Sequence, residues 1–308
     1  MPVTALSAII LDVPDVAEGV AFYRDAGLDA VVEGDHAWLR CRGRDRDCLE
    51  LIGGAPRKRL NHVRMRAEDL DGIAAKVESG GGTLVDAPAG METNGLWLRD
   101  PHGMLFNLRE EADEAPLPMA APFEINAPGR TIRVRQPAQP RRSQSPTVHP
   151  LRLGHMVAFT PDVMRSVAFA TEVFGMGLAD HSGEVVAFCC ARRDSDHHVL
   201  AFAKSGGIGF HHASFMVNDP DEVGRAGSAL AAKAGRGDWG FGRHTIGSNF
   251  FHYIKDPWGS WFEYYSDMDH IDDYALWTPS DYPLEDSLHL WGPNPPEDFI
   301  RNREIDPA

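Results

Sequence analysis

The chain has 308 residues, of which 43% are hydrophobic and 24% charged, a composition typical of a globular protein with two ordinary domains. Its formal net charge of -15 argues against a nucleic-acid partner, which would require clustered lysine and arginine side chains. The N-terminus lacks the basic and apolar segments of a signal peptide, and no apolar run reaches membrane-spanning length. We therefore expect a cytoplasmic protein without a membrane partner.

Strands and helices alternate in the first half of the chain. Short runs rich in apolar and β-branched residues predict strands over 5–13, 36–40 and 46–52, a strand starting near residue 62, and a hairpin over 96–110. Amphipathic spacing predicts one helix between Asp15 and Gly27 and another from Asp69 to about Ser79. The sequence DPHG forms the expected turn of the hairpin.

The second half repeats this order of elements. The segment LGHMVAFTPD at 153–162 matches SAIILDVPD at 7–15, and HHASFMVND at 211–219 matches NHVRMRAED at 61–69. The sequence DPWG at 256–259 likewise matches the DPHG turn of the first half. Self-similarity over this length predicts two copies of one fold.

We predict an α+β fold of two tandem domains, each built from paired β-α-β-β-β modules whose mixed sheet curls into a cup. The first domain is expected over 1–112 and the second over 151–268. Residues 113–150, which are rich in proline and include a basic run over 133–146, are predicted to form a linker. The tail over 269–308 contains scattered aromatic residues and is predicted to pack on the body of the protein.

Histidines are concentrated in the second half, where nine of the 14 lie between residues 155 and 270. A divalent iron or manganese site needs only two histidines and one carboxylate, which leaves coordination positions open. His155, His212 and Glu263, here called the metal trio, each lie in a predicted strand of that half. Because side chains alternate along a strand, neighbouring strands of a cup can bring these three together.

The first half provides an internal control for this interpretation. The residues that correspond there to the metal trio are Ala8, His62 and Asn107. Two of the three ligands are absent, so the first domain is predicted to hold no metal, and His62 is predicted to be structural. Because His212 aligns with His62, the adjacent His211 is expected to be a satisfied neighbour rather than a ligand.

A further motif surrounds the DPWG turn, since His244 and Tyr253 precede the turn and Glu263 follows it. Together with the repeat, this motif resembles the vicinal oxygen chelate superfamily. Within it, the chain resembles the two-domain type I extradiol ring-cleavage dioxygenases, of the catechol 2,3-dioxygenase and 2,3-dihydroxybiphenyl 1,2-dioxygenase kind. His252 departs from the family pattern, which usually has an aliphatic or aromatic residue there. Strand alternation predicts that the His252 side chain faces away from Tyr253.

The resemblance implies that the metal trio binds Fe(II), with Mn(II) as the alternative, and that O2 is a co-substrate. It implies that His198 is the acid–base residue, with the adjacent His197 as the alternative. His244 and Tyr253 would hydrogen-bond the oxygens of substrate or intermediate. An imidazole suits proton transfer because its ordinary pKa lies near neutrality.

Three further residues are candidates for the substrate pocket. Val157 shares a strand face with the first histidine of the metal trio, but a place in the core explains a valine equally well. Phe188 has the same two interpretations, and Arg243 is the candidate for binding a substrate carboxylate. Asp180 is expected to be a solvated carboxylate on the surface.

The resemblance implies a homo-oligomeric enzyme that cleaves the ring of a small-molecule catechol beside the vicinal diol. The sequence does not distinguish between monocyclic and bicyclic catechols as substrates. One alternative is isomerase or lyase chemistry of the same superfamily on another metal, which zinc or nickel in the purified protein would favour. The other is a non-enzymatic binding module of the bleomycin-resistance kind, which needs no metal ligands and against which the intact metal trio argues.

Overall fold

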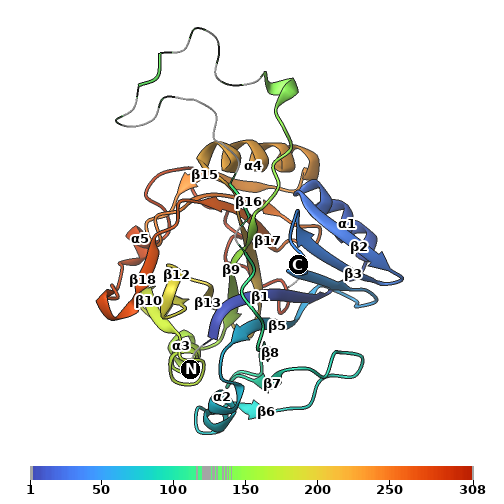
Figure 1. Ribbon diagram of the computed structural model, residues 1–308, viewed down its shortest axis with the longest axis vertical. Helices are drawn as coiled ribbons and strands as arrows, with labels where there is room; N and C mark the ends of the chain where they lie inside the picture. Colours follow the sequence, from blue (N-terminus) through green and yellow to red (C-terminus); the bar gives the residue numbers. More distant parts are fainter. Residues whose placement is uncertain are drawn as a thin grey trace.

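The computed structural model describes residues 3–306 except 116, 120–125, 127, 128, 130, 134, 136, 138 and 140. Two mixed sheets of eight strands each form the body, and each sheet carries two helices (Figure 1). The predicted α+β fold of two tandem vicinal oxygen chelate domains is confirmed. Several positions of the predicted linker over 113–150 lie outside the described residues, so the linker stays a prediction, as do the domain boundaries.

The first sheet has the strand order β2-β3-β4-β1-β5-β8-β7-β6. Strands β4 and β1 run parallel, β1 and β5 antiparallel, and β5 and β8 parallel. The elements of this half are β1 (Val3–Asp12), α1 (Val16–Asp25), β2 (Leu28–Glu33), β3 (His36–Cys41), β4 (Leu49–Ile52), β5 (Arg59–Ala67), α2 (Leu70–Val77), β6 (Thr83–Leu84), β7 (Leu96–Arg99) and β8 (Leu105–Arg109).

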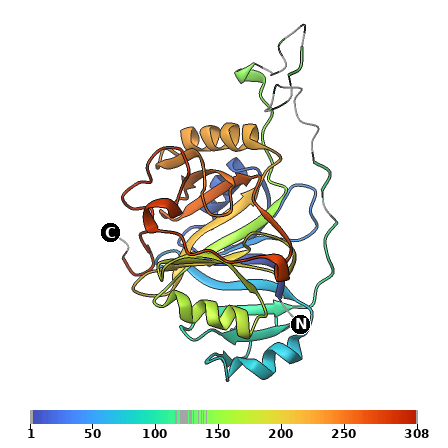
Figure 2. The same ribbon diagram turned by 90° about the vertical axis from the view of Figure 1, so that its left-hand side faces the viewer.

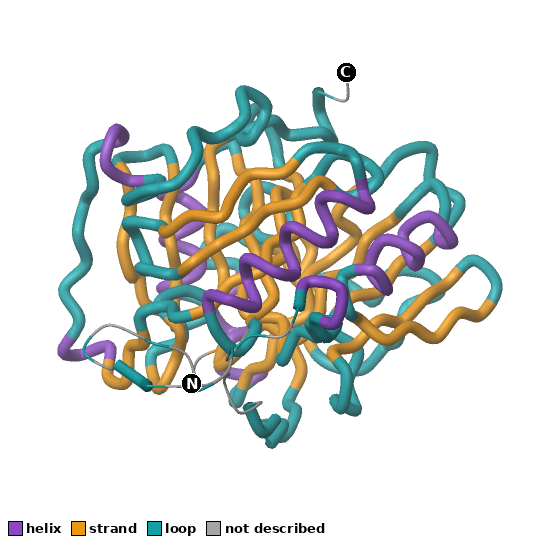
Figure 3. Tube along the Cα trace, turned by 90° about the horizontal axis from the view of Figure 1, so that it is seen from above, coloured by secondary structure: helices purple, strands orange, loops and turns teal. Residues whose placement is uncertain are grey.

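The second sheet has the equivalent order β10-β11-β13-β9-β14-β17-β16-β15 and the same sequence of pairing directions around its central strand. Its elements are β9 (Arg152–Thr160), α3 (Val163–Glu172), β10 (Gly177–Ser182), β11 (Val186–Cys190), β13 (Leu200–Lys204), β14 (Gly209–Met216), α4 (Pro220–Ala234), β15 (Asp238–Arg243), β16 (Phe250–Lys255) and β17 (Trp261–Ser266). Figure 3 shows the helices lying against the strands from outside.

Aspartates begin the helices at equivalent places in the two halves. Asp15 accepts hydrogen bonds from backbone N–H groups at the start of α1, and Asp162 does the same for α3. Asp69 and Asp219 cap α2 and α4 in this way. Each carboxylate satisfies an N–H group that has no partner inside its helix and lies at the positive end of the helix dipole. The repeated aspartates therefore explain why the helices begin where they do.

The strand registers confirm the alignment of the two halves. Register partners run across the central strands of the two sheets in two equivalent rows, Ala8–Arg64–Asn107 and His155–Ser214–Glu263. His62 and His212 each lie two residues before the middle member of their row, on the same face of the strand. The counterparts that the sequence alignment assigns to the metal trio are therefore the structural counterparts.

The two halves share one hydrophobic core, to which buried residues of both sheets contribute. At its centre the ring of Phe22 on α1 contacts Phe262 on β17 edge to face, with 6.0 Å between ring centroids. The Tyr264 hydroxyl, also on β17, donates to the carbonyl of Ala26 at 2.8 Å. The sheets consequently hold each other in a fixed relative position around the second cup.

The C-terminal tail lies against the second sheet (Figure 2). It contains β18 (His270–Asp273), which pairs with β12 (Arg193–Asp196), and a short helix α5 (Leu284–Ser287). The indole of Trp277 donates to the Ala179 carbonyl, and Phe299 is buried among the aromatic residues of β15, β16 and β17. No helix in the described part of the chain is long and apolar enough to cross a membrane.

Candidate metal centre

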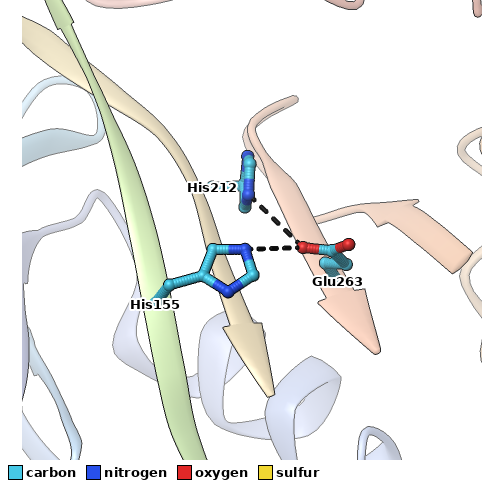
Figure 4. Close-up of side chains that lie close together, drawn as sticks. All are labelled: His155, His212 and Glu263. Carbon is cyan, nitrogen blue, oxygen red and sulfur yellow. Dashed lines mark ion pairs between the residues drawn. The ribbon is translucent and has the colours of Figure 1, made fainter. Parts of the chain in front are cut away.

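The metal trio lies in the cup of the second sheet, on three adjacent strands (Figure 4). His155 comes from β9, His212 from β14 and Glu263 from β17, and one ligand atom from each lies within 4.8 Å of the other two. The Glu263 Oε2 atom is 3.0 Å from His155 Nε2 and 3.4 Å from His212 Nε2. Among the described residues, this is the one such group of at least three histidine, cysteine or carboxylate side chains.

The donor set fits a divalent metal ion. All three side chains are buried, with exposed fractions between 0% and 4%. His212 Nε2 and Glu263 Oε2 have no hydrogen-bond partner among the described residues, although buried polar atoms normally have one. Two imidazoles and one carboxylate are the ligands of divalent iron sites with open positions, and the same set also binds zinc. A bound ion would satisfy the two atoms that the protein leaves without a partner.

The electrostatics of the metal trio favour the protonation states that bind a cation. Burial lowers the pKa of His212 to about 4, a shift that Glu263 partly opposes, so the imidazole is neutral near pH 7. Burial raises the pKa of Glu263, but the contacts with His155, His212 and His244 outweigh burial and hold that pKa well below its ordinary value. A neutral imidazole and an ionised carboxylate are the forms that bind metals.

His211 contacts His212 and fixes which of its ring nitrogens carries the proton. The Phe299 carbonyl can only accept a hydrogen bond, so His211 Nε2, at 2.8 Å from it, must donate. In a neutral His211 the other ring nitrogen then accepts from His212 Nδ1, which lies 2.6 Å away. His212 Nε2 consequently carries a lone pair on the side that faces Glu263. His211 is a satisfied neighbour, as expected, and its contact with the tail fixes the tautomer of the proposed ligand.

The predicted catalytic residues surround the metal trio. The His198 ring lies 4.2 Å from the His155 ring, measured between centroids, and 4.8 Å from the ring of Phe188. Burial, with smaller contributions from the histidines around it, holds the pKa of His198 well below its ordinary value. His244 lies beside Glu263, with Nε2 3.5 Å from Glu263 Oε1.

His244 and Tyr253 form a hydrogen-bonded pair that the tail orients. His244 Nδ1 donates to the carbonyl of Leu288 in the tail at 2.6 Å, so His244 Nε2 accepts from the Tyr253 hydroxyl at 2.9 Å. Burial, with Glu263 adding to it, holds the pKa of Tyr253 well above its ordinary value. The phenol therefore stays protonated and keeps a proton that it can donate.

Two of the other predicted residues lie apart from the metal trio. Among the described residues, Arg243 has no contact with the trio, because its guanidinium donates to the Ser248 carbonyl and lies over the Phe250 ring, 4.6 Å from the centroid. His252 faces away from Tyr253, as predicted, and contacts Asp238. Val157, which follows His155 on the same face of β9, is buried.

One residue near the metal trio, Asn249, was not predicted, and another, Asp180, lies in a different environment from the one expected. Asn249 donates from Nδ2 to Glu263 Oε1 at 3.3 Å, and its place between His244 and Tyr253 in the motif was a signal for it. The expectation that Asp180 is a solvated surface carboxylate is wrong, because only 4% of it is exposed. The tail covers Asp180, and no local pattern in the sequence indicates that contact.

The first cup has other contacts in place of the metal trio. Asn107, the counterpart of Glu263, donates to the carbonyl of Asn94 and accepts from Arg109. His62 packs on the ring of Trp97, with 4.7 Å between centroids, and burial lowers its pKa to about 3. His62 Nδ1 lies 2.9 Å from the amide oxygen of Asn61, and the structural role predicted for His62 stays a prediction.

A separate cavity of about 1130 Å³ lies between the two halves and includes none of the residues proposed for the site. Its lining contains several arginines, two of which form close ion pairs with carboxylates. Arg64 lies 2.8 Å from Glu50, and Arg152 lies 2.6 Å from Asp196. The metal trio is thus enclosed by protein rather than open to this cavity.

Comparisons with known proteins agree with this geometry. Residues 152–264 match the family described as the Glyoxalase/Bleomycin resistance protein/Dioxygenase superfamily, and residues 8–109 match a glyoxalase-like domain. Metapyrocatechase 2 of Cupriavidus necator is 38% identical over 296 residues, which cover 96% of this chain and 90% of that protein.

Solved structures share the fold over nearly the whole chain. The Mn(II)-bound glyoxalase of Novosphingobium aromaticivorans is 24% identical with a TM-score of 0.72, and the alignment covers 99% of both chains. Homoprotocatechuate 2,3-dioxygenase of Arthrobacter globiformis is 19% identical with a TM-score of 0.77, covering 98% of this chain and 91% of that one. Together with the similarity to metapyrocatechase 2, these findings show that the chain belongs to the type I extradiol ring-cleavage dioxygenases.

Proposed function

We propose that the protein cleaves the ring of a catechol beside its vicinal diol, with incorporation of O2 and with Fe(II) held by His155, His212 and Glu263. The observation that carries this proposal is the convergence of two histidines and an ionised glutamate, in which His212 Nε2 and Glu263 Oε2 have no hydrogen-bond partner among the described residues. A divalent metal in this place would bring catechol and O2 together and withdraw negative charge from the diol oxygens.

The proposed catalytic side chains around the metal trio have different roles. The His244–Tyr253 pair lies beside Glu263, so it can hydrogen-bond a diol oxygen and the negative charge that develops on it. His198, whose ring lies 4.2 Å from that of His155, takes and returns the proton that moves during ring opening. Burial excludes water from His198 and Tyr253, which strengthens their hydrogen bonds to a bound anion.

The test of this function is anaerobic reconstitution with Fe(II), followed by addition of catechols and O2. We expect oxygen uptake together with a yellow ring-fission product for at least one member of a panel of monocyclic and bicyclic catechols. Ranking the panel by kcat/KM identifies the preferred substrate. Absence of both signals across the whole panel would count against the proposal.

Isomerase or lyase chemistry is the second candidate, and two observations favour it. A structural relative of this chain is a Mn(II)-bound glyoxalase, and two histidines with one glutamate also suit zinc. The metal content of freshly purified protein separates the two functions. Iron or manganese with oxygen uptake supports ring cleavage, whereas zinc or nickel without oxygen uptake supports the second candidate.

Replacing Tyr253 with phenylalanine is expected to lower kcat about 10²- to 10³-fold, as the loss of one preorganised donor to a developing anion does. The metal content should stay unchanged because Tyr253 is not among the three proposed ligands. Steady-state kinetics and elemental analysis measure the two quantities. Tyr264→Phe is the matched control, since Tyr264 lies on β17 but donates to Ala26 in the first half. Equal losses in both variants would contradict a catalytic role for Tyr253.

We further propose that the protein is a cytoplasmic homo-oligomer. The four cysteines are buried free thiols, a state that a reducing compartment maintains. The tail exposes large apolar side chains, including Leu276 at 81% and Leu290 at 66%, which contact with a second copy would cover. The mass of the protein in solution, from light scattering, tests the oligomeric part of this proposal.

A further inference from the structure

A chain of three buried side chains leads from β10 to the proposed acid–base residue. Asp180 Oδ2 lies 2.7 Å from His197 Nε2, and His197 Nδ1 lies 3.1 Å from His198 Nδ1. The exposed fractions of the three residues are 4%, 0% and 3%. The carboxylate therefore contacts His198 through one intervening imidazole, in a place that water does not reach.

The hydrogen bonds along this chain determine which ring nitrogens carry protons. An ionised Asp180 can only accept, so His197 Nε2 must donate to it. A neutral His197 then has a lone pair on Nδ1, which accepts from His198 Nδ1. His198 consequently holds its proton on Nδ1, and its Nε2, on the opposite side of the ring, is free to accept another.

The C-terminal tail fixes the orientation of the Asp180 carboxylate. The backbone N–H of Ser280 donates to Asp180 Oδ1 at 2.7 Å, which leaves Oδ2 for His197. The backbone N–H of His197 itself donates to the Asp269 carbonyl at 2.7 Å, and the Trp277 ring packs against the imidazole. Three points of the tail thus hold the first two members of the chain in place.

We propose that Asp180 and His197 are positioning residues that hold His198 in the tautomer with Nε2 free to accept a proton. This inference deepens the proposed function, because it rests on His198 moving a proton during ring cleavage. Neither residue touches the metal trio in the described structure, so their effect reaches the reaction only through His198. The arrangement has the same logic as a carboxylate that holds a catalytic histidine in one tautomer, where an asparagine replacement leaves the geometry but reverses the tautomer.

Asp180→Asn tests the proposal because Ser280 determines how the new amide must lie. The amide oxygen keeps the acceptor position for the Ser280 N–H, so the amide N–H group faces His197 Nε2. His197 must then accept there and carry its proton on Nδ1. It donates to His198 Nδ1, which moves the His198 proton to Nε2 and removes the lone pair that the reaction needs.

The expected result is a loss of kcat of about 10²- to 10⁴-fold, by analogy with such tautomer reversals. The KM for catechol and the iron content should change less than about twofold. The 15N shifts of the His198 imidazole, in protein loaded with diamagnetic Zn(II) and assigned by comparison with His198→Gln, should show protonation at Nδ1 in the wild type and at Nε2 in the variant.

Asp194→Asn is the matched control, because Asp194 also pairs with a histidine, His270 at 2.9 Å, but on the exposed surface and without a link to His198. This variant should keep wild-type kcat and wild-type His198 shifts. If Asp180→Asn does not fold, His197→Phe replaces it, since a phenyl ring fills the space without relaying a hydrogen bond. A large loss of kcat together with mixed His198 tautomers is then expected.

Unchanged kcat in Asp180→Asn, or in His197→Phe where that variant is used, overturns the proposal. So does a loss of kcat without any change in the His198 tautomer, because that result indicates a structural role. The tautomer measurement does not depend on turnover. If the wild type cleaves no catechol but the tautomer reverses as expected, the ring-cleavage proposal fails while the positioning of His198 stands.

Discussion

Replacing His212 with alanine is expected to abolish metal retention and to reduce ring cleavage to the background rate. The variant leaves His155 and Glu263 as the remaining donors of the metal trio, and it leaves His211 Nδ1 without its partner. Loss of a group that only orients a metal ligand typically costs 10- to 100-fold in affinity or activity, so loss of the ligand should cost more than about 100-fold. Elemental analysis after gel filtration and oxygen uptake measure the two effects.

His62→Ala is the control for this prediction, because His62 occupies the equivalent position in the first sheet and is also buried. Both variants remove a buried imidazole and should lose stability for the same reason. The His62 variant should nevertheless keep its metal and its activity. Full metal content in the His212 variant would refute the assignment of His212 as a ligand. Loss of metal in the His62 variant would refute the functional asymmetry of the two halves.

Much of the fold was predictable because the chain contains it twice. Aspartates precede the helices at matching places, and the order of apolar segments is the same in both halves. The alignment that assigns Ala8 and Asn107 as counterparts of His155 and Glu263 follows from this repeat, and the strand registers confirm it. A repeat is informative because two similar segments that fold alike must satisfy the same hydrophobic and hydrogen-bonding requirements.

Elements at the edge of a sheet were less predictable. Strand β2 (Leu28–Glu33) was not predicted, since Val31 and Val32 are both about half exposed and its side chains show no alternation between core and solvent. The strand expected over 46–52 is shorter, because β4 begins only at Leu49. The charged residues before Leu49 belong to the turn that follows β3. The first residue of β4 is determined by where hydrogen bonding to β3 begins and not by composition.

The convergence of the metal trio could be anticipated, but its surroundings could not. Period-two alternation along adjacent strands is a local rule, so it places His155 and Glu263 in one cup once the strands are aligned. The environment of Asp180 depends on Ser280, about 100 residues away in the tail. Local sequence predicts that a carboxylate without an apolar pattern around it is exposed to solvent. Only the position of a distant segment shows that it is covered.

A buried ion pair that joins the two halves is expected to have a large effect on stability. Lys58, between β4 and β5 of the first half, forms an ion pair with Asp256 in the DPWG turn of the second half. Both side chains are almost completely buried. Burial lowers the pKa of Lys58, and the opposing effects of Asp256 and Glu304 do not fully offset this. The pair therefore stabilises the fold mainly because each charge compensates the other.

Removing one partner should consequently be costly, and removing both should not. We expect Lys58→Met to lower the free energy of unfolding by about 3–5 kcal/mol, the range found when a buried pair loses one charge. Asp256→Asn should cost a similar amount, since it leaves Lys58 charged and buried. Urea titration followed by tryptophan fluorescence measures these changes.

The double variant Lys58→Met with Asp256→Asn separates the charge effect from the loss of packing. The asparagine oxygen can still accept the hydrogen bonds that Asp256 takes from the Trp258 and Ser260 N–H groups. Methionine fills most of the lysine volume without a charge, so we expect the double variant to recover to within about 1–2 kcal/mol of the wild type. Additive losses in the double variant would contradict this account.

The first half contains the matched control for this cycle. Asp100 accepts from the His102 and Met104 N–H groups in the equivalent turn, but no described cation forms an ion pair with it. Burial raises the pKa of Asp100, although its backbone hydrogen bonds oppose the shift, so Asp100 gains little from being ionised. Asp100→Asn should therefore cost less than about 1 kcal/mol, because the amide preserves the turn and no partner charge is left behind. If Asp100→Asn lowers the free energy of unfolding as much as Asp256→Asn does, the effect of Asp256→Asn comes from the turn and not from the buried charge of Lys58.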